Sequence, residues 1–246
     1  MPDARASDFM IELDGVSLEA SGREVLSQVT FRSAARRVGV VGRNGSGKST
    51  LARVLAGLVK PSAGQVRVGG IDVFRDRRAA LGTVGILFQN AEHQIIFPRV
   101  VEEIAFGLRQ QGMGKAEANG RAEAVLASFD KLHWKDATVA ALSQGQKHLV
   151  CMMAVLAMQP KLLILDEPYA GLDIPTRRQL GRYLARAETR IFHISHDPSD
   201  VAECDELFWL DRGRVVARGG AAELLPGFTA EMTRLGDLDD IADLAG

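Results

Sequence analysis

The chain has 246 residues and a mass of 26.6 kDa, and its 30 lysines and arginines against 31 acidic residues give a net charge of −1. A hydrophobic fraction of 46% and a charged fraction of 25% are typical of a soluble globular protein and exclude a mainly disordered chain. The balanced charge also argues against a general nucleic-acid binder, which usually carries a basic excess, so no nucleic-acid partner is expected.

Several sequence features bear on the cellular compartment. The longest apolar run, residues 149–158, is shorter than the roughly 18 residues that a membrane-spanning helix needs. Residues 1–8 carry acidic side chains and lack the apolar centre of a secretion signal. The two cysteines, Cys151 and Cys204, are too few for a disulfide framework. We therefore expect a reduced, cytoplasmic protein.

The N-terminal part of the chain predicts strands followed by a strand–turn–helix unit. Residues 9–18 and 25–31 alternate between apolar and polar side chains, which predicts an antiparallel hairpin. Residues 37–42 form a short apolar run, typical of a strand buried on both faces. A glycine-rich turn leads from this strand into residues 48–58, which have helical spacing, and residues 65–68 predict another strand.

The remainder of the chain predicts a helical block and a second group of strands. Between residues 90 and 158 the pattern indicates helices over 101–108, 116–129 and 144–158. Buried strands follow at 161–165 and 190–195, with a crossover helix over 176–188 between them. A hairpin is expected at 206–218, and one or two short, exposed, acidic helices over 221–246. Together these elements predict an α/β core with an antiparallel β-subdomain and an inserted helical subdomain.

Residues 42–49 fit the phosphate-binding pattern G-x-x-x-x-G-K-[ST], with the required strand before it and helix after it. Glycines let backbone N–H groups surround a triphosphate, and the helix N-terminus favours negative charge. Lys48 is expected to reach the β- and γ-phosphates, and the Ser49 hydroxyl to hold Mg²⁺. The alternative is a glycine turn that only joins a strand to a helix. The predicted ATP-binding residues here are Gly42, Arg43, Asn44, Gly45, Ser46, Gly47, Lys48, Ser49 and Thr50.

Two acidic residues, Asp166 and Glu167, follow the apolar run 162–165. The carboxyl ends of strands in open α/β sheets are where ligands bind. Asp166 suits coordination of Mg²⁺ through water, and Glu167 suits orientation and deprotonation of an attacking water, a role typically worth 10² to 10⁴ in rate. The alternative is a pair of acids at the start of a loop, with Pro168 ending the strand.

Between these two motifs the sequence Leu-Ser-Gln-Gly-Gln-Lys occupies residues 142–147, directly before a predicted helix. With the phosphate loop and Asp166-Glu167, it resembles the ATP-binding-cassette (ABC) ATPases, whose signature is usually Leu-Ser-Gly-Gly-Gln. The resemblance covers residues 9–220 in the order of the family. It also matches Gln89 to the Q-loop, residues 170–173 to the D-loop, and His196 to the switch histidine.

The resemblance implies one ABC ATPase domain over residues 1–246. The nucleotide-binding core would comprise about 9–89 and 159–220, the helical subdomain about 90–158, and a C-terminal helical tail 221–246. It implies that ATP and Mg²⁺ are the cofactors. Two chains, either a homodimer or a heterodimer with a paralogous ATPase, would pack head-to-tail around two nucleotides.

The resemblance also assigns roles to single residues. Glu167, His196, Gln89 and Lys48 would be catalytic, and Ser49, Gln89 and Asp166 would serve the metal. Ser143, Gly145, Gln146 and Asp173 would contact ATP across the dimer, since donors at a helix N-terminus bind phosphate. If His196 stood without the other motifs, the favoured interpretation would be a structural histidine at a strand end, with its hydrogen bonds made inside the protein. His193 points to the opposite face of the strand, so it is interpreted as a core residue and not as half of a metal pair.

The chain departs from the family pattern at two positions. Gln144 replaces a glycine of the signature. Ala20 stands where the family usually has an aromatic residue that stacks on adenine, a contact worth about 1–3 kcal/mol. Apolar neighbours such as Val25 are the alternative cover for the base. The effect of Gln144 on the signature is left open, and so is base selectivity with Ala20 at the aromatic position. Phosphate binding is still expected.

Residues 89–97 and 100–107 resemble the A component of energy-coupling-factor (ECF) transporters, which are vitamin and metal importers. In that family this stretch contacts the membrane T component, and the substrate-binding S component is served indirectly. The resemblance therefore implies a peripheral protein at the cytoplasmic face of the membrane, contacting the T component through residues 89–106. The alternative for Ile95, Phe97 and Phe106 is the core of the helical subdomain.

Within the ECF family, the chain most resembles the biotin-type ATPase, in residues 169–176, in the missing aromatic residue and in the short tail. The ATPases for cobalt or nickel uptake are the second most similar type. Three alternatives remain. They are the ATPase of a conventional ABC importer, a soluble ABC ATPase of iron–sulfur assembly or DNA repair, and a module that senses ATP without hydrolysing it. Retained Glu167 and His196 argue against the last of these.

Overall fold

A computed structural model of the protein describes residues 9–238. It contains a four-stranded antiparallel sheet in the order β2-β1-β4-β5 and a six-stranded, mainly parallel sheet in the order β10-β9-β3-β8-β7-β6. The strands of the first sheet are β1 (Ile11–Ala20), β2 (Arg23–Ser33), β4 (Ala63–Val68) and β5 (Ile71–Asp72). Those of the second are β3 (Arg37–Val41), β6 (Val84–Leu87), β7 (Leu162–Asp166), β8 (Arg190–Ile194), β9 (Glu206–Asp211) and β10 (Arg214–Gly219).

The two sheets enclose helix α1 (Lys48–Leu55), so that one core holds all three layers. Leu51 and Leu55 of this helix are fully buried and belong to the same cluster as Leu13 of β1 and Phe192 of β8. Strands β3, β7 and β8 are buried almost along their whole length, which explains their continuous apolar sequences. The carboxyl ends of β3, β7 and β8 therefore meet beside the N-terminus of α1.

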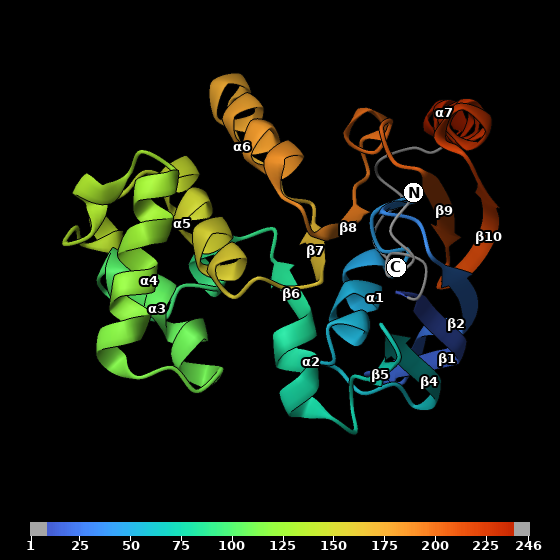
Figure 1. Ribbon diagram of the computed structural model, residues 1–246. Coiled ribbons are helices and arrows are strands. Elements are labelled where there is room, and N and C mark those ends of the chain that lie inside the picture. Colours follow the sequence, from blue (N-terminus) through green and yellow to red (C-terminus); the bar gives the residue numbers. More distant parts are fainter. Residues whose placement is uncertain (1–8, 239–246) are drawn as a thin grey trace, which may run out of the picture.

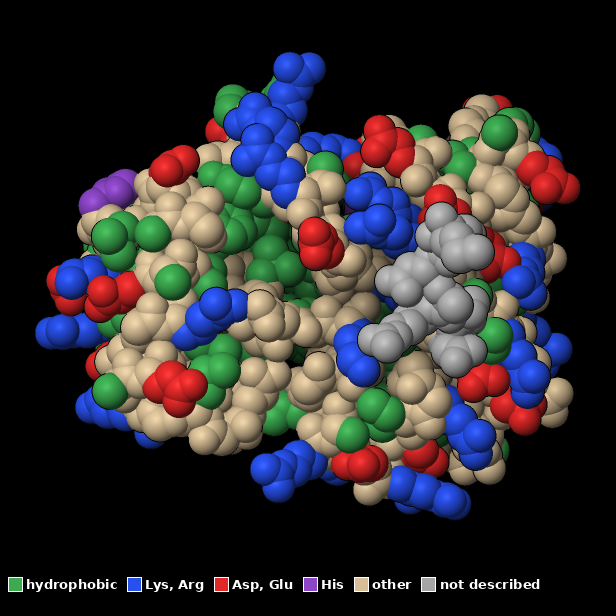
Figure 2. Space-filling view, in the orientation of Figure 1, with side chains coloured by type: hydrophobic (Ala, Val, Ile, Leu, Met, Phe, Trp, Pro, Cys, Tyr) green, Lys and Arg blue, Asp and Glu red, His purple; other side chains and the backbone are tan. Residues whose placement is uncertain are grey.

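A helical lobe forms the other half of the molecule (Figure 1). It contains α3 (Val100–Gln110), α4 (Lys115–Ser128) and α5 (Gln144–Ala157), which pack around a second core. Helix α6 (Ile174–Arg186) carries the chain from β7 to β8 and lies between the lobe and the strands. Figure 2 shows a hollow between the two halves in which hydrophobic side chains are exposed.

Most of the predicted elements are confirmed with small changes in their bounds. The expected helix at 48–58 ends at Leu55. Three short elements escaped prediction, namely β5, β6 and α2 (Arg77–Thr83), because two to seven residues show too little periodicity to stand out. Among the described residues, no helix combines the length and apolarity needed to cross a membrane.

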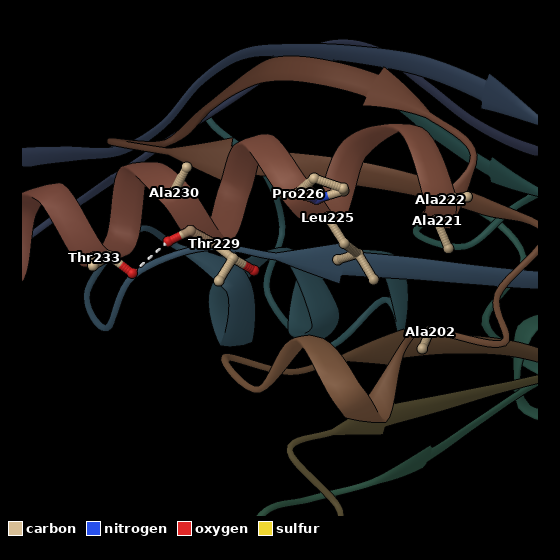
Figure 3. A pocket seen from close by; sticks show the side chains of 8 residues that line it. All are labelled: Ala202, Ala221, Ala222, Leu225, Pro226, Thr229, Ala230 and Thr233. Atoms are coloured by element: carbon tan, nitrogen blue, oxygen red, sulfur yellow. Dashed lines mark hydrogen bonds between the residues drawn. The ribbon is translucent and has the colours of Figure 1, made fainter.

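The C-terminal segment was expected to form one or two short, exposed helices; in the part that the structure describes it forms one longer helix, which is exposed over most of its side chains but packs one face against the core. Helix α7 (Ala221–Leu238) is one helix, and its Phe228 is buried against Trp209 of β9, with ring centroids 5.4 Å apart. Small side chains of α7, among them Ala222 and Ala230, line a groove that also borders Ala202 (Figure 3). The rest of the predicted tail, residues 239–246, lies outside the described residues.

Candidate active site

The loop of residues 42–47 joins the end of β3 to α1, and its glycines are required by close packing. A Cβ on Gly42 would lie 2.2 Å from the backbone oxygen of Leu210. Gly47 has φ = +101° and a Cβ there would lie 2.8 Å from the Val25 oxygen. The Ser46 N–H donates to the Arg43 oxygen at 3.1 Å, whereas the buried Ser46 Oγ has no partner among the described residues. This tight loop is the shape that wraps phosphate groups.

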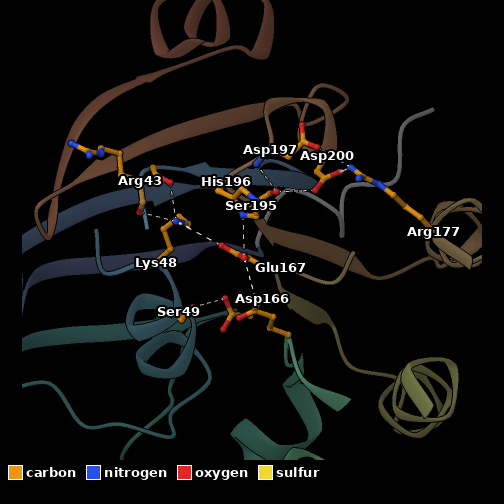
Figure 4. A network of polar contacts seen from close by, with 12 residues as sticks. Arg43, Lys48, Ser49, Asp166, Glu167, Arg177, Ser195, His196, Asp197 and Asp200 are labelled. Atoms are coloured by element: carbon orange, nitrogen blue, oxygen red, sulfur yellow. Dashed lines mark hydrogen bonds and ion pairs between the residues drawn. The ribbon is translucent and has the colours of Figure 1, made fainter. Parts of the chain in front are cut away.

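Lys48 is the first residue of α1, and its side chain folds back beneath the loop (Figure 4). Its Nζ donates hydrogen bonds to the backbone oxygens of Gly42 at 2.8 Å and Arg43 at 2.9 Å. Only 5% of the residue is exposed. Burial lowers the pKa of Lys48, while the nearby Glu167 and Asp166 carboxylates oppose that shift.

Ser49 and Asp166 face each other across the gap between α1 and β7. The Ser49 Oγ donates to Asp166 Oδ1 at 2.8 Å. Burial raises the pKa of Asp166, and the Ser49 hydrogen bond works against this shift. A hydroxyl and a carboxylate are hard oxygen ligands, the kind that Mg²⁺ prefers. The donor set therefore fits the predicted magnesium site.

Glu167 stands immediately after β7, with φ = +50°, a backbone region that residues other than glycine occupy infrequently. Its N–H donates to the Ile194 oxygen of β8 at 3.0 Å, which fixes the turn. Its Oε2 accepts from Gln89 Nε2 at 3.3 Å and lies 3.1 Å from His196 Nδ1. Its Oε1 lies 3.8 Å from Lys48 Nζ (Figure 4).

The structure therefore brings Lys48, Glu167, Gln89 and His196 together from four separate chain segments. These are the four residues for which catalytic roles were predicted, and Ser49 and Asp166 adjoin them through their own contacts. A carboxylate that is 9% exposed, next to a lysine and a phosphate-type loop, is placed to act as a base on water. The roles themselves remain predictions.

Sequence reasoning missed the group that holds the His196 loop. Ser195 Oγ donates to Asp200 Oδ2 at 2.8 Å and accepts from the Asp197 N–H at 3.0 Å. Arg177 of α6 forms ion pairs with both Asp197, at 3.2 Å, and Asp200. Because Arg177 lies on a different element some 20 residues away, no local pattern in the sequence signals this contact.

The signature residues lie at the start of α5. Ser143 caps the helix: its Oγ accepts from the Gln146 N–H at 3.3 Å, and its own N–H donates to Gln146 Oε1 at 2.8 Å. A Cβ on Gly145 would lie 2.7 Å from Thr176 Cγ2 of α6. Asp173 caps α6 by accepting from the Thr176 N–H at 3.0 Å.

The signature residues border two pockets, and a residue of the phosphate-binding motif lines one of them. Ser143, Gly145 and Gln146 border a pocket of about 190 Å³ that no residue of the phosphate loop lines. Gln144, the departure from the usual signature, instead borders a cavity of about 820 Å³ shared with Ser49 and others.

His193 of β8 has a buried side chain. His193 is 6% exposed, and burial together with the positive charges of Arg37 and Arg177 lowers its pKa to about 4, so the interpretation as a core residue is confirmed.

Ala20, at the position where the family usually has an aromatic residue, lies exposed at the end of β1. The half-buried Val25 adjoins the phosphate loop through its carbonyl group, and cover of the base by Val25 stays a prediction.

Comparison with known proteins identifies the family. Residues 26–170 match the family model described as "ABC transporter". A biotin transport ATP-binding protein, BioM, of Rhodobacter capsulatus is 48% identical over 92% of this chain and 96% of its own. The chain belongs to the ABC transporter family. Hydrolysis of ATP in the presence of Mg²⁺ is general to this family. The family therefore agrees with the predicted activity and the predicted cofactors.

Two further relatives of this ABC ATPase confirm the predicted resemblance to the ECF type. The energy-coupling factor transporter ATP-binding protein EcfA2 of Symbiobacterium thermophilum is 39% identical over 76% of this chain and 67% of its own. The solved structure of cbiO1 from Clostridium perfringens, part of the ABC transporter complex cbiONQ, has a TM-score of 0.73 and 28% identity. It covers 94% of this chain and 98% of its own, and it confirms the predicted fold class.

Proposed function

We propose that this protein is the ATP-hydrolysing A component of an ECF-type importer that takes up biotin. The observation that carries the enzymatic part is the position of Glu167, which Gln89, His196 and Lys48 surround at 3.3, 3.1 and 3.8 Å. The relative that is 48% identical is a biotin transport protein, which supports biotin over a metal ion as the cargo. The whole chain, residues 1–246, would act as one ATPase unit with its helical lobe as subdomain.

In the proposed reaction, the residues of one chain hold the phosphates and activate the water. Lys48 and the N–H groups of the loop neutralise the β- and γ-phosphates, and Ser49 and Asp166 would hold Mg²⁺. The ion supplies neutralisation of the charge that builds up on the phosphate oxygens. Glu167 takes a proton from the attacking water, while Gln89 and His196 orient Glu167 and the γ-phosphate.

A second copy, or a paralogous ATPase, would complete each nucleotide site. Ser143 and Gly145 lie at the N-terminus of α5, where free N–H groups and the helix dipole attract phosphate. Within one chain, Ser143, Gly145 and Gln146 border a pocket that no residue of the phosphate loop lines, which supports a head-to-tail dimer with two ATP molecules between the copies. Hydrolysis removes the γ-phosphate contact that holds the dimer closed.

A surface built by residues 89–106 would contact the membrane T component, and through it the S component. The buried carboxylate of Glu103 accepts hydrogen bonds from the backbone N–H groups of Ile96 and Phe97, at 2.9 and 2.8 Å. This fixes a loop that leaves Ile96 65% exposed, beside the packed rings of Phe97 and Phe106. An exposed apolar side chain held rigidly is typical of a protein interface.

An ion pair links that surface to the signature helix. Lys147 of α5 donates to Glu92 at 2.6 Å, and Glu92 follows Gln89 by three residues. Closure of the dimer would thus move residues 89–106 together with α5. With these contacts the protein would work as a peripheral subunit at the cytoplasmic face of the membrane.

The test is uptake of labelled biotin by vesicles that contain this chain with a T component and a biotin-binding S component. We expect ATP-dependent biotin uptake, abolished by Glu167→Gln, which keeps ATP binding and lowers hydrolysis about 10²- to 10⁴-fold. Uptake of Co²⁺ or Ni²⁺ in place of biotin would refute the cargo. Hydrolysis at the parental rate by Glu167→Gln would refute the assignment of the base.

A further inference from the structure

A second pocket, of about 750 Å³, lies beneath α6 on the side away from the phosphate loop's own cavity. Four arginines line it, Arg37 at the start of β3 and Arg177, Arg178 and Arg182 on α6, against two acids. Figure 2 shows basic side chains gathered over α6. A volume between 300 and 1,000 Å³ is usual for sites that hold small molecules.

The two acids leave part of this positive charge uncompensated. Asp200 is occupied by Arg177 and by the Ser195 hydroxyl. The Glu203 side chain is 93% exposed and reaches only within 4.0 Å of Arg37. Within residues 9–238, Arg178 and Arg182 have no ion pair. The pocket therefore presents two guanidinium groups that are free to bind an anion.

The interior of the pocket contains a buried polar atom without a partner. His193 is 94% buried, and its Nε2 makes no hydrogen bond with any described residue. The imidazole packs edge-on against Tyr169, with ring centroids 5.6 Å apart, and Arg177 lies over the same Tyr169 ring at 5.3 Å. His193 and Tyr169 therefore form the buried end of the pocket, and Arg177 joins this end to the arginines on α6.

We propose that this pocket binds a small organic anion, namely a carboxylate carried on an apolar body. The carboxylate would pair with Arg178 and Arg182, because guanidinium groups bind carboxylates in a two-point geometry. The body would lie against the apolar lining residues that reach the surface, Ile174, which is 74% exposed, and the half-buried Tyr169.

Occupancy of the pocket would affect ATP hydrolysis, because its walls continue into the active site. Tyr169 follows Glu167 by two residues, and His193 precedes His196 by three. Arg177 holds the His196 loop through Asp197 and Asp200. Arg177 lines the same pocket, so a carboxylate bound to Arg178 and Arg182 also attracts Arg177 and weakens those two ion pairs, and His196 is less firmly placed against Glu167. We therefore expect the bound anion to lower the rate of hydrolysis.

The first probe is biotin, because it is itself a carboxylate on an apolar body. The choice of biotin rests on the proposed function, whereas the argument for the pocket is independent of that function. Binding to the full chain is measured by calorimetry with biotin, with biotinamide, which lacks the carboxylate, and with octanoate. The double variant Arg178→Gln/Arg182→Gln tests the site, and Arg186→Gln, an exposed arginine of the same helix outside the pocket, is the matched control.

We expect at least one of the two carboxylates to bind the parent chain and Arg186→Gln, and to bind the double variant at least tenfold more weakly. Saturation with it should lower the ATPase rate of the parent chain and leave that of the double variant unchanged. Binding of octanoate without biotin supports the pocket and separates it from the cargo, which the uptake assay decides independently. Absence of binding by both carboxylates, equal binding by the double variant, or equal binding of biotin and biotinamide overturns the proposal.

Discussion

The two buried histidines make the stability of the protein depend on pH in a way that the structure lets us estimate. His148 of α5 is 2% exposed, and burial lowers its pKa to about 4. His193 of β8 is 6% exposed, and burial with the charges of Arg37 and Arg177 lowers its pKa to about 4 as well. In the unfolded chain a histidine titrates near 6.5.

Because the folded pKa is the lower one, the unfolded state takes up protons first as the pH falls. Each histidine therefore contributes stability that is fully present above about pH 6.5 and is lost as the pH falls from there toward 4. At pH 5, a shift from 6.5 to about 4 corresponds to about 2 kcal/mol for each histidine relative to pH 8. The two together then weaken the folded state by about 4 kcal/mol.

The assay is urea unfolding at pH 8 and pH 5, for the parent chain and for His148→Gln, His193→Gln and His133→Gln. Each of the first two variants should lose about 2 kcal/mol less between the two pH values than the parent chain. His133 is exposed and serves as the control, with the same loss as the parent. Equal losses in the parent and in both buried variants would refute the reasoning, whatever the absolute stabilities are.

Three further predictions concern the site. Ser49→Ala removes a proposed Mg²⁺ ligand beside Asp166, so the Mg²⁺ concentration for half-maximal ATPase activity should rise about 10- to 100-fold. Asp200→Asn breaks the ion pair that holds the His196 loop, so kcat should fall about tenfold while KM for ATP stays constant. Gly42→Ala places a Cβ 2.2 Å from a backbone oxygen and should cost about 1–3 kcal/mol, a fall in Tm of at least about 2 °C.

Each of these has a control or a result that contradicts it. For Gly42→Ala the control is Gly120→Ala, a helical site with open space around it, where Tm should stay constant or rise. An unchanged Mg²⁺ requirement in Ser49→Ala would contradict the proposed metal ligand. A rise in KM with constant kcat in Asp200→Asn would show that the loop serves ATP binding and not the positioning of His196.

The sequence by itself determined the motifs whose chemistry is local. The phosphate loop, the buried strand before Asp166 and the position of Ser143 at the start of a helix could be predicted, because each is defined by neighbouring residues and by backbone requirements of a few positions. The same holds for long periodic elements such as α5 and for the resemblance to ABC ATPases. Short elements such as β6 carried too few residues to show a period.

Only the tertiary structure decided which of these residues meet and what surrounds them. Glu167 lies within 3.8 Å of Lys48, Gln89 and His196 because parallel strands end at one edge of the sheet, a fact of strand order that no local pattern contains. The contact of Arg177 with Asp197 and Asp200, and the arginine pocket beneath α6, likewise arise from the packing of elements far apart in the chain. Local propensities fix what each segment forms, whereas burial of the apolar faces fixes how segments come together.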